Sequence, residues 1–137
     1  MTLNEDIVTR IDNSKKLLKK AFEGLDPINY SKIYKEVWKA RAEVEYVVVS
    51  LKLLNSNSIS ELFEDWKINL SKTLKQVRSD DKIREFFSET IESFDNLENI
   101  NDIKDFYMQC WILKEKLTVL LNIVKPKPKI TKSKDIE

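Results

Sequence analysis

The chain has 137 residues, of which 42% are hydrophobic and 34% charged, and its 24 Lys and Arg nearly balance its 23 Asp and Glu. This composition excludes a disordered or collagen-like chain and is typical of one packed domain. Because the sequence has no His and one Gly, it also excludes imidazole catalysis, His-ligated metal sites and glycine-rich phosphate loops.

The first two expected helices span residues 4–23 and 26–54. Asn4 is expected to cap the first helix, and Gly24 lies where a left-handed residue commonly ends one. Asp26 and Pro27 form a cap followed by a first-turn proline, which predicts the start of the second helix. Apolar residues at helical spacing form the inward stripe of the first helix: Ile7, Ile11, Leu18, Ala21, Phe22 and Leu25.

Three more helices are expected in the rest of the chain. Ser58 and Glu61 fit a capping box that begins a third helix reaching about residue 77. Ser79 can cap a fourth helix, although a kinked continuation of the third is an open alternative. A connection at 96–101 precedes a fifth helix, which Asp102 caps and which reaches residue 124 before Pro126. We therefore predict an all-α, up-and-down bundle of about five helices over residues 1–124, with an extended or disordered basic tail at 125–137.

The second and fifth helices carry regular heptads. Spacing that alternates three and four residues is typical of the knobs-into-holes seam between bundle helices. Cys110 lies in this seam, where a small buried hydrophobe is the expected role. The heptad positions are Tyr30, Ile33, Val37, Ala40, Val44, Val47, Leu51 and Leu54 on one helix, and Ile103, Phe106, Cys110, Leu113, Leu117, Leu120 and Val124 on the other.

A second apolar stripe lies opposite the seam on both helices when residues are placed at about 100° intervals. Two-sided helices must be covered either by other helices of the same chain or by another chain. The sequence leaves both alternatives open. As a candidate partner interface, the second stripes comprise Trp38, Ala42, Tyr46, Val49 and Leu53, with Met108, Ile112, Val119 and Ile123.

Lysines gather at two places in the chain. A basic helix face and a basic tail can contact nucleic-acid phosphates without sequence specificity. A solvated charged face and a solubilising tail explain the same lysines without any partner. The candidate anion contacts are Lys15, Lys16, Lys19 and Lys20 on the first helix, and Lys125, Lys127, Lys129, Lys132 and Lys134 in the tail.

Two pairs of acidic residues have a spacing similar to that found in a known enzyme family. Glu61-x-x-Glu64, followed after 27 residues by Glu92-x-x-Asp95, is similar to the acidic pattern of the all-α, MazG-like nucleotide pyrophosphohydrolases. That resemblance implies Mg²⁺ held between bundle helices. Magnesium ligands must converge on one cavity, whereas helical spacing places these four acids away from the apolar stripes. Solvated acidic faces are therefore the preferred interpretation, with a Mg-dependent hydrolase as the remote alternative.

The leading hypothesis is a non-enzymatic interaction or assembly protein, acting as a homo-oligomer or as a subunit of a larger complex. A nucleic-acid-associated accessory protein is the alternative. We expect no cofactor, no metal and no small-molecule substrate. The acidic N-terminus, the lone cysteine and the lack of a long apolar segment predict a cytoplasmic protein that does not enter membranes.

Overall fold

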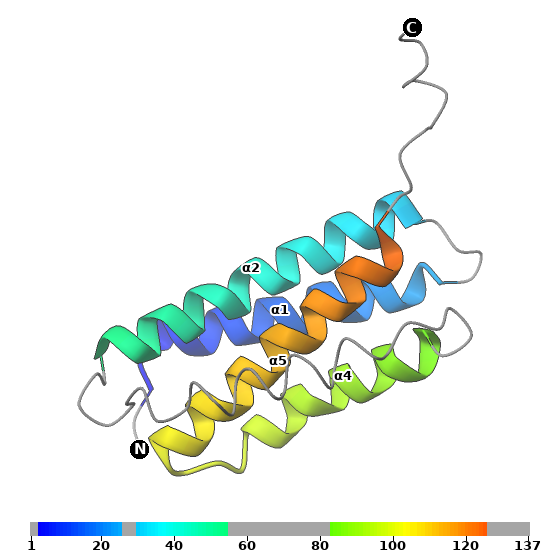
Figure 1. Cartoon of the computed structure of the whole chain (residues 1–137). Coiled ribbons are helices and arrows are strands. Elements are labelled where there is room, and N and C mark those ends of the chain that lie inside the picture. The colour runs from blue at the N-terminus through cyan, green and yellow to red at the C-terminus, as the bar shows by residue number, and fades with distance from the viewer. Residues whose placement is uncertain (1–2, 26–29, 55–82, 126–137) are drawn as a thin grey trace, which may run out of the picture.

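The computed structural model describes residues 3–25, 30–54 and 83–125. The regular elements in these ranges are all α-helices, which confirms the all-α prediction. None of these helices is both long and apolar enough to cross a membrane. The helices are α1 (Glu5–Glu23), α2 (Tyr30–Leu54), α4 (Ile83–Leu97) and α5 (Ile103–Val124) (Figure 1).

Several predicted features lie outside the described residues. They are the expected third helix, the caps at residues 26–27, 58–61 and 79, and the tail beyond Lys125. A bundle of five helices with a basic tail therefore stays a prediction.

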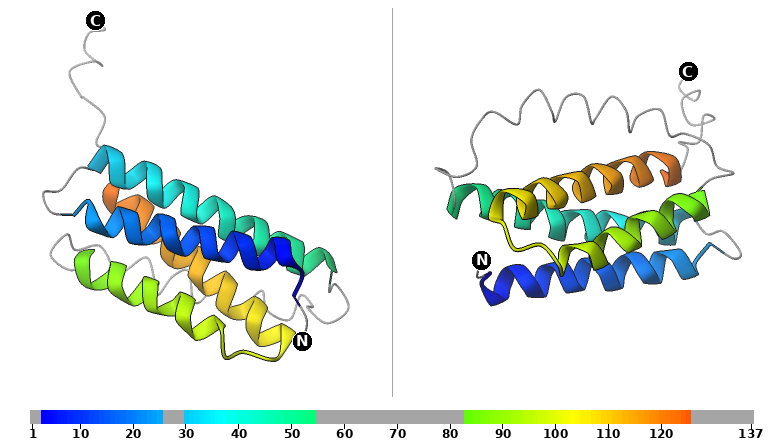
Figure 2. Two further views of the ribbon diagram at one scale, coloured as in Figure 1. Left: turned by 180° about the vertical axis from the view of Figure 1, so that it is seen from behind. Right: turned by 90° about the horizontal axis from the view of Figure 1, so that it is seen from below.

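The four described helices pack in a closed arrangement. Helix α1 packs against α2 and α4, and α5 packs against the same two helices from the other side. Packed neighbours run in opposite directions (Figures 1 and 2). As a result the end of α2 and the start of α4 lie at opposite ends of the bundle (Figure 1).

The core follows the heptads. On α2 the six heptad residues from Ile33 to Leu51 are buried, and on α5 all are buried except Ile103, which is half-buried. Leu54 was expected in this seam but is 65% exposed, because it is the last residue of α2 and lies where the helix leaves the core. The seam interpretation is confirmed for the body of both helices.

Local signals set the helix ends. Asn4 Oδ1 accepts the Ile7 N–H at 2.9 Å, and Asp102 Oδ2 accepts the Asp105 N–H at 3.2 Å, so both predicted N-caps are confirmed. The expectation of a left-handed conformation at Gly24 is wrong, since the φ of Gly24 is −79°. Instead, the Gly24 N–H donates to the Ala21 carbonyl at 3.0 Å. This three-residue bond closes the last turn of α1 without a positive φ.

Candidate functional site

The side of α2 opposite the seam carries an exposed apolar row, here called the α2 outer face. The side chains of Trp38, Tyr46, Val49 and Leu53 are 56%, 44%, 52% and 75% exposed. The alanine between them is also exposed. Because the row advances in steps of four, four, three and four residues, its members lie within an arc of about 80° around the helix axis. In chain order the α2 outer face consists of Trp38, Ala42, Tyr46, Val49 and Leu53.

The second stripe on α5 has different surroundings. Met108, Ile112 and Ile123 are half-buried, and Val119 is buried. This stripe is therefore largely covered within the chain, whereas the stripe on α2 is open. The two stripes look equivalent in the sequence, but only the one on α2 presents large apolar side chains to solvent.

Helix α1 contributes a residue to the α2 outer face that the sequence did not indicate. The guanidinium carbon of Arg10 lies 3.6 Å from the centre of the Tyr46 ring. Arg10 Nη1 donates to Glu43 Oε1 at 2.7 Å, and Arg10 Nε lies 3.4 Å from an Asp6 carboxylate oxygen. Asn13 Nδ2 donates to the other Glu43 oxygen at 3.3 Å. Because Arg10 is held by two carboxylates, it positions one face of the Tyr46 ring.

The opposite edge of the α2 outer face carries an ordered pair of charges. Arg41 Nη1 lies 3.4 Å from Glu45 Oε2. Arg41 Nε also donates to Thr118 Oγ1 at 2.7 Å, which ties this edge to α5. An apolar centre with a polar rim is the arrangement typical of protein interfaces.

The basic cluster on α1 is partly neutralised inside the chain. Lys15 donates to Asp95 of α4, and Lys16 Nζ lies 3.0 Å from Asp12 Oδ2. The hydrogen bond that Lys15 donates to Asp95 raises the pKa of Lys15, and the same bond lowers the pKa of Asp95. Lys19 and Lys20 are exposed. The surface thus offers less positive charge to a phosphate backbone than the four lysines suggest.

The tail lysines cannot be placed in the same way. Lys125 is exposed, whereas Lys127, Lys129, Lys132 and Lys134 lie outside the described residues. The predicted contact between the basic tail and nucleic acid stays a prediction.

The acidic pairs do not form a cluster in the part of the chain that is described. Glu92 and Asp95 are exposed on α4, and Asp95 binds Lys15. Glu61 and Glu64 lie outside the described residues. Among residues 3–25, 30–54 and 83–125, no three His, Cys, Asp or Glu side chains gather closely enough to hold a metal ion.

Cys110 has the environment of a core residue. Its side chain is fully buried in the seam, and burial raises the pKa of its thiol to about 12. A thiol with this pKa stays protonated near neutral pH and is a poor nucleophile. Its position confirms the role expected from the heptad.

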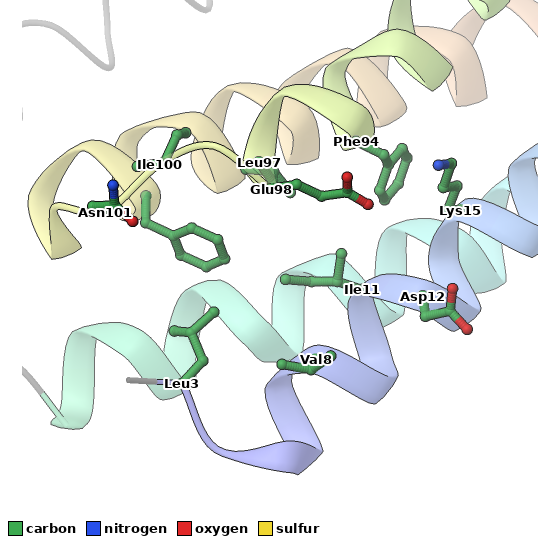
Figure 3. Close-up of a pocket in the computed structure, with 11 residues that line it drawn as sticks. Leu3, Val8, Ile11, Asp12, Lys15, Phe94, Leu97, Glu98, Ile100 and Asn101 are labelled. Carbon is green, nitrogen blue, oxygen red and sulfur yellow. The ribbon is translucent and has the colours of Figure 1, made fainter. Parts of the chain in front are cut away.

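A second surface feature, a cleft between α1 and α4, has a volume of about 530 Å³. Val8 and Ile11 of α1 face Phe94 and Leu97 of α4 across it, with Lys15 at one end (Figure 3). Val8 is 52% exposed and is an apolar residue outside the predicted inward stripe of α1. An apolar residue at that position is the one sequence signal for this cleft. The side chain of Lys15 is already bound to Asp95.

Comparison with known protein families, with curated proteins and with solved structures finds no match to this chain. The function is therefore inferred from the surfaces described above.

Proposed function

We propose that this protein is a non-enzymatic interaction and assembly protein that associates with a second copy of itself through the α2 outer face. The observation that carries the proposal is the row of four large apolar side chains exposed along one helix. Full burial of a completely exposed large apolar side chain is worth about 1.5–3 kcal/mol, and each of these side chains, at 44–75% exposed, would gain part of that on burial. A row of this kind on a monomer favours association.

The residue types on the α2 outer face also favour a protein partner. Trp38 and Tyr46 belong to the types that contribute most to binding energy at interfaces, and Arg10 adds a third such side chain beside Tyr46. A symmetric pair of identical chains is the commonest form of soluble oligomer. The pairing of Lys15 and Lys16 with carboxylates makes the nucleic-acid alternative less well supported.

The test is a charge placed in the middle of the row. Val49→Glu is expected to abolish association while the chain stays folded, because an exposed glutamate is tolerated in a monomer but costly when buried without a partner. Val8→Glu is a matched control, since Val8 and Val49 are both 52% exposed and lie on different surfaces. Sedimentation velocity over a range of concentrations measures association, and circular dichroism measures folding.

A third variant separates an interface from a core. Val47 is fully buried two residues before Val49, so Val47→Glu is expected to unfold the chain. If Val49→Glu unfolds it too, the α2 outer face is part of the core. The proposal is also wrong if the wild-type protein remains monomeric at every concentration, or if Val8→Glu weakens association as much as Val49→Glu.

A further inference from the structure

The α2 outer face has a symmetric pattern along the helix. Trp38 and Leu53 are equally far in sequence from the point between Glu45 and Tyr46, and Ala42 and Val49 are also equally far from it. In an antiparallel pair of identical helices, residues that are equally far from the two-fold axis lie opposite each other. Four of the five residues of the row therefore match in the register that such a pair requires, and the fifth, Tyr46, lies beside the axis.

We propose that two copies of the chain pair their α2 helices antiparallel, about a two-fold axis between Glu45 and Tyr46. This inference rests on the proposed function. In this arrangement Val49 of each copy lies opposite Ala42 of the other, so that a large side chain faces a small one. Trp38 lies opposite Leu53 of the second copy. Two helices that pack 8–10 Å apart need a small residue where a large one enters from the other side.

The lysines beside the row do not by themselves select the direction of the pair. In a parallel pair each exposed lysine lies at the height of the same lysine in the other copy, and in the antiparallel register Lys39 of one copy lies at the height of Lys52 of the other. The antiparallel register does separate the two Lys52 residues from each other, by about 20 Å along the helix axis at 1.5 Å per residue.

The residues nearest the proposed axis are already held in place by their own chain. Glu45 lies 3.4 Å from Arg41, so its carboxylate is partly neutralised where the two copies approach. On the other edge, the Tyr46 ring is stacked under Arg10. An aromatic ring that is ordered before binding loses less entropy when it is buried.

Cysteine cross-linking tests the register. Ala42→Cys and Val49→Cys are made as separate proteins carrying tags of different size, and each is oxidised alone and after mixing. An antiparallel pair gives the mixed disulfide and little of either single-variant dimer, because the two copies of residue 42 are about 10 Å apart along the axis. The native Cys110 is fully buried with its pKa raised to about 12, so the wild-type chain is the unreactive control.

Lys52→Cys provides a second readout that leaves the apolar row intact. No cross-linked dimer is expected from it alone, whereas a parallel pair would give one. Single-variant dimers of Ala42→Cys and Val49→Cys as abundant as the mixed product would overturn the antiparallel register while association itself stands. Sedimentation of the wild-type chain as a monomer would instead overturn the proposed function, and the register with it.

Discussion

The guanidinium carbon of Arg10 lies 3.6 Å from the centre of the Tyr46 ring, and this contact joins α1 to the exposed face of α2. Arg10 is held in turn by Glu43 at 2.7 Å and by Asp6 at 3.4 Å. The ring therefore has one face packed within its own chain, while Tyr46 is still 44% exposed. One aromatic side chain of the α2 outer face is therefore held in place by its own chain.

Arg10→Ala is accordingly expected to weaken self-association while leaving the chain folded, because the Tyr46 ring loses its support. Arg10→Lys is expected to restore only part of the affinity, since an ammonium group cannot stack on the ring and bind Glu43 as a planar guanidinium does. Dissociation constants from sedimentation equilibrium measure both effects. Lys16→Ala, which removes an exposed ion pair with Asp12 on the same helix, is the control. An equal loss of affinity in Arg10→Ala and Lys16→Ala would contradict a positioning role for Arg10.

A buried hydroxyl joins α1 to α2. Ser14 is fully buried, and its Oγ donates to the Ala40 carbonyl at 2.7 Å. Ser14→Ala is expected to lower the free energy of unfolding by about 0.5–1.5 kcal/mol, the usual net value of one such bond. Urea denaturation measures this loss. Ser88→Ala, at an exposed position on α4, is expected to leave stability nearly unchanged. A stability change in Ser14→Ala no larger than that control would show that the bond contributes nothing.

The ion pair between Lys15 and Asp95 predicts a pH dependence of stability. The hydrogen bond with Lys15 lowers the pKa of Asp95 in the folded chain, so its contribution is present above the carboxyl's unfolded pKa and is lost as the pH falls through the folded pKa. The same bond raises the pKa of Lys15. The amine's contribution is therefore present below its unfolded pKa and is lost as the pH rises through the folded pKa.

Unfolding free energies of the wild-type chain and Asp95→Asn, measured from neutral to acidic pH, test the acid side. We expect the wild-type chain to be the more stable of the two near neutral pH, and the difference to shrink below about pH 4. Glu92→Gln controls for the loss of a carboxylate on the same helix. A difference between the wild-type chain and Asp95→Asn that stays constant over the acidic range would contradict the pKa direction assigned to Asp95.

Much of the fold could be predicted from local pattern. The heptad spacing places Val37, Val44, Leu113 and Leu117 in the seam, and all four are buried. The cap at Asn4 was predictable because its side chain reaches a backbone donor only three residues away. Gly24 and Leu54 departed from expectation because their conformation and exposure depend on how each helix ends against its neighbours.

The candidate site was only half predictable. The second stripes on α2 and α5 could be identified from helical spacing, but spacing alone does not show what lies over each of them. The structure leaves Trp38 and Leu53 exposed, while it buries Val119. The pairs Arg10 with Tyr46 and Lys15 with Asp95 had no sequence signal, since each joins two helices whose relative register is set by packing.

By itself, the sequence determined the all-α class, the residues of the seam and the caps of α1 and α5, because each depends on spacing within about one or two helical turns. Only the tertiary structure decided which apolar stripe is open, which lysines are neutralised and which cation supports Tyr46. These depend on contacts between side chains 36 and 80 residues apart in the chain, as in the pairs of Arg10 with Tyr46 and Lys15 with Asp95. The physical reason is that a helix's periodicity specifies which residues share a face, whereas packing against other helices determines which faces are covered.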